Sequence, residues 1–174
     1  MQTLPQGDIQ GVCHMIFVTL GTIPFRFDRA IAWLDSLLVQ KVIQEPMLLQ
    51  HGVTNVSTLL RHPQVTATPL LELQQFLEHV DSSRLIIAHA GQGTTRMLAA
   101  RSARFILLPR LQRYGEHIDD HQLWFSQGID ALGVPYCISL AELEQLIQNP
   151  PPPFPHKLFD GPKLADHLLQ KYPV

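Results

Sequence analysis

The chain has 174 residues, of which 45% are hydrophobic and 16% charged, and its 13 Lys and Arg against 15 Asp and Glu give a formal net charge of −2. This length suits one domain with a substantial core, and this composition excludes a disordered chain. The near-balanced charge gives no electrostatic reason to bind nucleic acid. No apolar run approaches the roughly 20 residues that span a bilayer, and residues 1–12 lack the charged and apolar regions of a signal peptide.

Strands and helices are expected to alternate between residues 15 and 148. In chain order the hydrophobic pattern predicts a strand over 15–20, a helix over 28–40, strands over 46–50 and 65–71, a helix over 72–80, a strand over 84–89, a helix over 93–102, a strand over 105–108, a helix over 119–127, a strand over 134–138 and a helix over 139–148. Alternation at this βαβ spacing predicts an α/β fold, a Rossmann-like parallel sheet with helices on both faces.

Local signals mark some of these bounds. Asp28 is the expected N-cap of its helix, and Ser139 with Glu142 three residues later forms the pattern of a capping box. Pro69 interrupts the expected strand over 65–71 and weakens it.

The distribution of prolines divides the chain. Seven of the 14 prolines fall between Pro150 and Pro173, and the run at 150–155 predicts an extended connector. Helical spacing returns after Gly161. We therefore expect four segments: a flexible N-terminal segment over 1–12, a nucleotide-sugar-binding domain over 13–148, a proline-rich connector over 149–160, and over 161–174 a C-terminal helix that docks back on the domain, the alternative being a frayed tail.

The two cysteines, Cys13 and Cys137, each lie beside an apolar run. Such positions favour two buried free thiols in a reducing compartment. A disulfide between them is the alternative.

A glycine-containing loop over 89–95 joins an expected strand to an expected helix. Gly91 and Gly93 allow a tight turn, and the helix N-terminus adds unpaired N–H donors and the positive end of a dipole. This arrangement suits a phosphate group, although the same glycines also suit an ordinary packed turn. The loop is neither a Walker A motif nor a full dinucleotide fingerprint, because it lacks the lysine of the first and the third glycine of the second.

A second polar segment, 109–122, follows another expected strand. Its Arg110 and Arg113 are suited to pairing with phosphate or carboxylate. Its metal-ligating residue types are His117, Asp119, Asp120 and His121. Only the two histidines have the spacing of side chains on one helix face, so we expect no metal site here. The alternative to a ligand site is an exposed loop followed by a helix N-terminus.

Together, residues 16–22, 89–94 and 109–122 resemble the glycosyltransferase family 28 C-terminal domain in order and spacing, over roughly Met15 to Gln148. In particular they resemble the PssE-type small subunits of two-subunit exopolysaccharide glycosyltransferases. The resemblance implies one half of a GT-B glycosyltransferase, a subunit that binds a UDP-sugar as donor. A membrane-associated partner subunit would bind the acceptor, a lipid-linked oligosaccharide.

The resemblance also implies where and how such a subunit works. The reaction would be an inverting displacement that needs no metal and no cofactor beyond the donor substrate. The protein would be cytoplasmic and peripheral at the inner membrane, held there by its partner rather than by direct insertion.

Carried over position by position, the resemblance assigns the following residues to the donor site: Gly21, Thr22, His89, Gly91, Gly93, Thr94, Arg110, Tyr114, His121 and Gln122. The first two would form a glycine loop near the diphosphate, and His121 and Gln122 would face the sugar. Candidates for a catalytic base are Glu116, His117 and Asp119, although the base could equally lie on the partner subunit.

The sequence departs from the family pattern at three positions. Met97 stands where the family carries a carboxylate for the ribose, and Ser102 and Arg104 replace the glycine and proline of a following turn. Losing a charged hydrogen bond to the ribose would cost roughly 1.5–3 kcal/mol of nucleotide affinity. Two functional alternatives therefore stand beside the donor subunit: a non-catalytic interaction subunit of the same fold, and an unrelated nucleotide-binding α/β domain.

Overall fold

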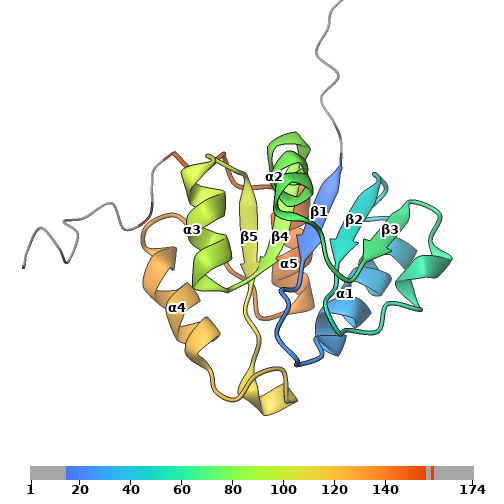
Figure 1. Cartoon of the computed structure of the whole chain (residues 1–174), viewed down its shortest axis with the longest axis horizontal. Helices are drawn as coiled ribbons and strands as arrows, with labels where there is room; N and C mark the ends of the chain where they lie inside the picture. Colours follow the sequence, from blue (N-terminus) through green and yellow to red (C-terminus); the bar gives the residue numbers. More distant parts are fainter. Residues whose placement is uncertain (1–14, 156–157, 159–174) are drawn as a thin grey trace, which may run out of the picture.

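Strand β1 (Ile16–Thr19) lies at the centre of a five-stranded parallel sheet with the strand order β3-β2-β1-β4-β5 (Figure 1). The computed structural model describes residues 15–155 and 158. The other strands are β2 (Met47–Gln50), β3 (Val65–Thr68), β4 (Leu85–His89) and β5 (Phe105–Leu108). The helices are α1 (Asp28–Val39), α2 (Leu73–Ser82), α3 (Gln92–Ala100), α4 (His121–Asp130) and α5 (Leu140–Gln148), with short 3₁₀ turns η1 (Leu59–Arg61) and η2 (Gln112–Tyr114).

Helices cover both faces of the sheet, as the sequence predicts (Figure 1). Alternate strand residues such as Val18 and Ile87 join a buried cluster with apolar residues of α1 and α5. The intervening residues, such as Phe17 and Ile86, join a second cluster with residues of α2, α3 and α4. Strands β1, β2, β4 and β5 are therefore buried on both faces, which explains their largely apolar sequences, whereas the edge strand β3 is partly exposed.

The carboxyl ends of neighbouring strands meet at one edge of the sheet. The register pairs Thr19 of β1 with Ala88 of β4 and with Gln50 of β2. The chain enters β1 at the upper edge in Figure 1, so the loops after β1, β4 and β5 gather at the lower edge. In open parallel α/β sheets this is the edge where ligands bind.

The sequence prediction of a strand over 134–138 is wrong. Within the described residues, this segment makes a single isolated bridge between Tyr136 and Leu107. Leu107 N–H donates to the Pro135 carbonyl at 2.9 Å and Cys137 N–H donates to the Leu107 carbonyl at 2.9 Å. Pro135 itself has no N–H to extend the ladder.

Two expected helix starts also need correction. Phe27, not Asp28, occupies the N-cap of α1, and its N–H donates to Thr54 Oγ1 at 3.1 Å. Helix α4 begins at His121 rather than at Asp119. The carboxylate of Asp119 accepts from the backbone N–H of His121, a local bond of the kind that competes with helical hydrogen bonding.

Other local expectations are confirmed. The Ser139–Glu142 capping box forms, with Glu142 N–H donating to Ser139 Oγ at 3.3 Å and Ser139 N–H donating to Glu142 Oε2 at 3.0 Å. Strand β3 ends at Thr68, before Pro69. Cys137 is a buried free thiol, and burial raises its pKa to about 12. Cys13 lies outside the described residues.

The described part of the proline-rich connector has no helix or strand and packs against the domain. Phe154 is buried, its N–H donates to the Ala103 carbonyl at 2.9 Å, and its ring centroid lies 6.0 Å from that of Phe105. The connector therefore folds back beside β5. The expected C-terminal helix over 161–174 and the N-terminal segment over 1–12 lie outside the described residues.

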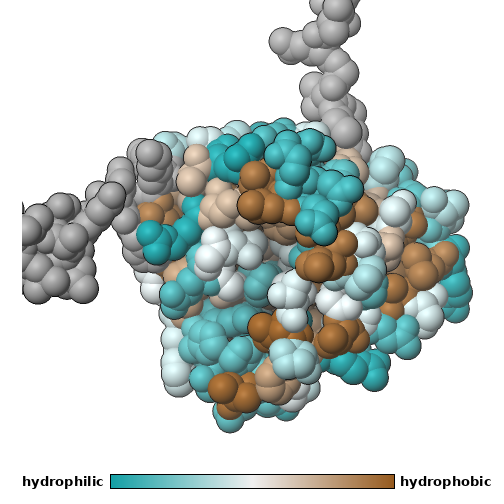
Figure 2. Space-filling model, viewed as in Figure 1, coloured by the Kyte–Doolittle hydropathy of each residue, from teal (hydrophilic) through white to brown (hydrophobic). Residues whose placement is uncertain are grey.

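On the face shown in Figure 2, apolar side chains form separate groups among polar ones. Among the residues that the structure describes, no helix has both the length and the apolar character needed to cross a bilayer.

A prediction follows from the backbone at Ser102, which has a φ of 52°. Side chains with a Cβ are disfavoured in this left-handed region, whereas glycine is not. Replacing Ser102 with glycine should raise the free energy of unfolding by about 1 kcal/mol, measured by chemical denaturation. The same change at Ser36, inside α1, should instead lower it by about 1 kcal/mol, because glycine weakens a helix interior. Destabilisation by both changes would contradict this reading of the turn.

Candidate functional site

The imidazole of His89 lies between the two glycine loops at the carboxyl edge. A Cβ added to Gly21 would lie 2.8 Å from His89 Nε2, and one added to Gly91 would lie 2.4 Å from the same atom. Gly21 also has a φ of 75°, which favours glycine. The ring can occupy this position only because both neighbours lack side chains, so three expected site residues form one packed unit.

His89 is uncharged near neutral pH. Its Nδ1 lies 3.3 Å from the Thr19 carbonyl, and only 9% of the residue is exposed. Burial, followed by the nearby charge of Arg110, lowers the His89 pKa to about 4. With the Nδ1 proton directed to the carbonyl, Nε2 is the unprotonated nitrogen and faces the glycines.

The loop after β2 packs against the same unit, which the sequence analysis did not anticipate. A Cβ on Gly52 would lie 2.6 Å from the Gly21 carbonyl oxygen, and Gly52 has a φ of 57°. The signal in the sequence was a glycine directly after an expected strand. Gly52 therefore belongs to the set of glycines that shape this edge.

The N-terminus of α3 opens beside this packed unit. Gly91 is its N-cap and no side chain caps the helix. Gln92 and Gly93 are exposed, and Thr94 is half-buried. Thr95 is buried and its hydroxyl donates to the Gly91 carbonyl at 2.9 Å, so it does not face the opening. Exposed Thr22 comes from the facing loop after β1. Backbone N–H groups and the positive dipole end can accept an anion here.

Arg110 lies behind the glycine loops rather than in the opening. Only 1% of it is exposed. Its Nη2 donates to the Leu20 carbonyl at 2.7 Å, and its Nη1 contacts carbonyls of Phe25, Arg26 and Glu116 at 2.9–3.2 Å. Its guanidinium carbon lies 4.5 Å from the centre of the Phe27 ring. Burial lowers the Arg110 pKa to about 10. Buried in this way, Arg110 does not reach a phosphate in the opening, contrary to the sequence-based expectation. It holds the loop after β1 in place instead.

Glu116 is also committed to internal contacts. Its carboxylate accepts hydrogen bonds from Nε and Nη2 of Arg29 at 2.9 and 2.8 Å and from the Leu111 N–H at 2.8 Å. Only 2% of the Glu116 residue is exposed. Arg29 in turn donates to the Pro109 carbonyl at 2.8 Å. A carboxylate held in a buried bidentate pair has no free lone pair directed to the opening. Glu116 is therefore a poor candidate for a catalytic base.

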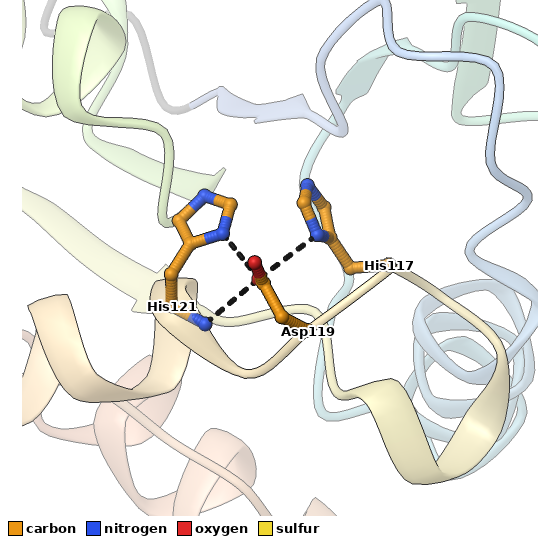
Figure 3. Close-up of side chains that lie close together, drawn as sticks. All are labelled: His117, Asp119 and His121. Atoms are coloured by element: carbon orange, nitrogen blue, oxygen red, sulfur yellow. Dashed lines mark hydrogen bonds and ion pairs between the residues drawn. The ribbon is translucent and has the colours of Figure 1, made fainter.

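His117, Asp119 and His121 form a separate cluster at the start of α4 (Figure 3). His121 Nδ1 is hydrogen bonded to Asp119 Oδ1, and the His121 backbone N–H donates to the same oxygen at 3.1 Å. These bonds hold the pKa of Asp119 below its usual range, with the backbone N–H as the largest cause. Asp119 is therefore an anion at neutral pH, already paired with His121.

The remaining expected residues lie in different environments. Gln122 is buried, and its side-chain oxygen accepts from the Arg110 N–H at 3.1 Å. Tyr114 is exposed and lies over Arg29 and Arg113, at the rim of a hollow of about 500 Å³ that Trp33 also lines. The structure thus brings the glycine loops together but sets Tyr114 in a neighbouring surface.

Met97 packs partly against the second core cluster. It lies one and a half turns into α3, on the helix whose N-terminus forms the opening. Its thioether is at best a weak acceptor, so the position offers no strong hydrogen bond to a ligand.

Comparison with known proteins places the chain among glycosyltransferases. A family model described as the glycosyltransferase family 28 C-terminal domain matches residues 15–150. No curated protein matches the chain in sequence.

Solved structures share the fold at low sequence identity. The NMR solution structure of ALG13 aligns with a TM-score of 0.57 at 16% identity, covering 91% of this chain and 93% of that one. A crystal structure described as the glycotransferase of kitacinnamycin gives 0.61 at 14%, covering 86% of this chain and 38% of that one. MurG of Acinetobacter baumannii gives 0.55 at 18%, covering 84% and 46%. The chain thus spans less than half the length of the last two.

The packing of His89 predicts different effects for two glycines of one loop. An alanine at Gly91 would collide with the His89 ring, so Gly91→Ala should destabilise the fold, by about 1–3 kcal/mol for an overpacked site. A Cβ on Gly93 would meet nothing within 4 Å, and Gly93 lies in α3, so Gly93→Ala should be neutral or stabilise by up to about 1 kcal/mol. Chemical denaturation measures both, and equal effects would contradict the packing.

The low pKa of His89 predicts acid sensitivity. Above pH 6.5 His89 is neutral in both the folded and unfolded states, but between its unfolded value of 6.5 and its folded value of about 4 only the unfolded state takes up the proton. The free energy of unfolding should therefore fall as the pH drops through this window, by up to about 3 kcal/mol from this residue. In His89→Asn, which keeps a donor for the Thr19 carbonyl, that part of the pH dependence should be absent. If the free energy of unfolding depends on pH in the same way in the wild type and in His89→Asn, the predicted contribution of His89 is wrong.

Proposed function

Because the chain belongs to the family of glycosyltransferase family 28 C-terminal domains, we propose that it is the donor-binding half of a GT-B glycosyltransferase and that its donor is a UDP-sugar. A partner subunit, associated with the membrane, supplies the acceptor side of the cleft, and the acceptor is a lipid-linked oligosaccharide of exopolysaccharide or glycoconjugate synthesis. The pair works at the cytoplasmic face of the inner membrane.

The observation that carries the proposal is the uncapped N-terminus of α3 beside the two glycine loops that His89 joins. A diphosphate placed there accepts hydrogen bonds from backbone N–H groups and faces the positive end of the helix dipole. Thr22, exposed in the loop after β1, and Thr94, half-buried in the first turn of α3, are the hydroxyl donors that the proposal adds. This is the position that the family resemblance assigns to the diphosphate.

Buried charge behind the loops supports an anionic ligand. Arg110 and Arg29 are both largely buried, and Glu116 balances only one of them. The surplus positive charge acts through the loops rather than by contact, because the Nη atoms of Arg110 bind backbone carbonyls. In a medium of low dielectric constant such a charge is weakly screened.

The chemistry follows from this arrangement. In an inverting displacement at the anomeric carbon, the bond to the UDP oxygen breaks while the acceptor hydroxyl attacks from the opposite side. Negative charge grows on the leaving diphosphate, and preorganised N–H groups that already point to it lower the barrier. Charge compensation of this kind by the loops and α3 requires no metal ion. The family resemblance assigns His121 and Gln122, the first two residues of α4, to the side of the donor sugar; of these, Gln122 is buried with its side-chain oxygen bonded to the Arg110 N–H.

Two candidates are left for the base that deprotonates the acceptor hydroxyl: a residue of the partner subunit, or the His117–Asp119 pair. Glu116 is excluded from this role by its buried pair with Arg29.

The described residues form one Rossmann-like unit, similar in extent to ALG13 and to less than half of MurG. A GT-B cleft requires two such units, and the proposal assigns the second to the partner subunit.

Met97 favours one alternative, a non-catalytic subunit of the same fold that stabilises or recruits the membrane-associated partner. A methionine at this position cannot make the hydrogen bond to the ribose that the family resemblance implies, and Met97 packs against the second core cluster instead. The two functions differ in whether the chain binds nucleotide.

Calorimetric titration with UDP separates them. For the donor-binding subunit we expect saturable binding with a micromolar to submillimolar Kd, and much weaker binding of UMP, because the glycine loops bind the diphosphate. Met97→Glu should tighten UDP binding by roughly ten- to a hundredfold, the equivalent of 1.5–3 kcal/mol for a charged hydrogen bond.

Met97→Gln is the matched control, since it has the same length without the charge. It should give less of the gain than Met97→Glu. If UDP binds only to Met97→Glu, the interaction subunit is favoured. If folded wild-type and Met97→Glu proteins both fail to bind UDP, alone and with the partner subunit, the donor-binding proposal is wrong.

A further inference from the structure

Three metal-ligating side chains converge where the loop after β5 enters α4 (Figure 3). His117 and Asp119 come from the loop and His121 is the first residue of the helix. One ligand atom from each lies within 4.8 Å of the other two. The spacing His-x-Asp-x-His brings them together because the chain turns at Asp119 instead of continuing as helix.

Both imidazoles present the same nitrogen to the carboxylate. His121 Nδ1 is hydrogen bonded to Asp119 Oδ1, and His117 Nδ1 lies 3.3 Å from that oxygen. His117 Nδ1 is buried and has no hydrogen-bond partner within the described residues. An unpaired buried nitrogen costs free energy unless another group binds it.

The two rings are held in place before any ligand arrives. The His117 ring stacks on Phe25 with 5.7 Å between ring centres. The His117 and His121 rings are nearly perpendicular, with 4.4 Å between their centres. The His121 backbone N–H fixes the carboxylate. Little side-chain freedom remains to be lost when an ion binds, which favours affinity.

The donor set selects the class of ion. Two imidazole nitrogens and one carboxylate oxygen suit Zn²⁺ and neighbouring transition metals, whereas Mg²⁺ and Ca²⁺ prefer oxygen ligands throughout. Two ligand atoms about 2.0–2.1 Å from a tetrahedral Zn²⁺ lie about 3.4 Å apart. The separation of His117 Nδ1 and Asp119 Oδ1, 3.3 Å, matches this value. His121 Nδ1 and Asp119 Oδ1 are in direct hydrogen-bond contact, so these two atoms must move apart, with loss of the proton between them, when the ion binds.

We propose that His117 Nδ1, Asp119 Oδ1 and His121 Nδ1 bind one Zn²⁺-class transition-metal ion, whose fourth position is open to water or to another oxygen donor. The ion ties the loop after β5 to the first turn of α4. It also gives the unpaired His117 nitrogen a partner.

This site does not depend on UDP binding. With His117 and Asp119 bound to the ion, the base of the proposed transfer reaction lies on the partner subunit. Binding through Nδ1 leaves Nε2 of His121 available to a ligand at the neighbouring loops, so both sites can be filled together. The metal test below uses no nucleotide, and the UDP titration uses no metal. Either proposal can therefore fail alone.

The test is a titration of the metal-free chain with Zn²⁺ against a chromophoric zinc indicator. His121 has a side chain that is 46% exposed, so His121→Gln should fold normally. We expect His121→Gln and Asp119→Asn each to weaken Zn²⁺ binding by about tenfold or more, since even changes to residues that only support metal ligands often cost 10–100-fold.

His62→Gln is the matched control. His62 Nε2 lies 2.8 Å from Asp35 Oδ1, the same kind of pair, but no third metal ligand joins it in the described part of the chain. Zn²⁺ binding should be unchanged in His62→Gln. Equal affinity of His121→Gln and His62→Gln would overturn the proposal, as would the absence of measurable binding to the wild-type protein.

A measurement on the wild-type chain guards against variants that misfold. Co²⁺ in a site with histidine ligands and low coordination number absorbs visible light, and imidazole NMR signals report which rings bind. We expect Zn²⁺ to shift the signals of His117 and His121 and to leave that of His62 in place. Shifts confined to other histidines would show that the ion binds elsewhere.

Discussion

The buried guanidinium of Arg110 holds the carboxyl edge of this sheet together. It reaches from the end of β5 to carbonyl oxygens of the loop after β1 and of its own loop, so segments about 85 residues apart share one donor group. A buried charge is costly unless it is fully engaged. Here backbone carbonyls accept from Nη1 and Nη2 and the Phe27 ring lies against the guanidinium, while the buried Nε has no hydrogen-bond partner within the described residues. The first glycine loop takes its shape from these contacts.

The charge of Arg110 also affects its neighbours. It helps to keep His89 neutral, and a neutral ring can pack between Gly21 and Gly91 without bringing a second cation into the core. Glu116 offsets the charge of Arg29 nearby. The result is buried positive charge behind loops beside which the uncapped N-terminus of α3 offers backbone N–H groups. Such a surface favours an anion without relying on a flexible side chain in the opening.

Several features could be read from the sequence because they depend on short-range chemistry. Strands buried on both faces have continuous apolar runs, and the Ser139–Glu142 box needs only residues three apart. Other features could not. The isolated bridge at Tyr136 depends on the backbone N–H and carbonyl of Leu107, which bond to the neighbours of Tyr136 in the chain. The start of α4 depends on two side-chain bonds, from the Gln112 N–H to Asp120 and from the His121 N–H to Asp119. The pattern of charges suggested a ligand contact for Arg110, yet its burial follows from the packing of the loop after β1 against the loop after β5.

The βαβ order, the parallel sheet and the glycine loops at its carboxyl edge can all be predicted from residue order, because hydrophobic period and glycine placement specify local structure and right-handed crossovers specify the topology. The role of each polar side chain depends on the folded chain. The tertiary structure turned Arg110 and Glu116 inward, placed His89 between two glycines, and gathered His117, Asp119 and His121 at one turn. These roles depend on contacts between residues far apart in the chain, and residue type and spacing do not encode which of several neighbours a charged group will meet.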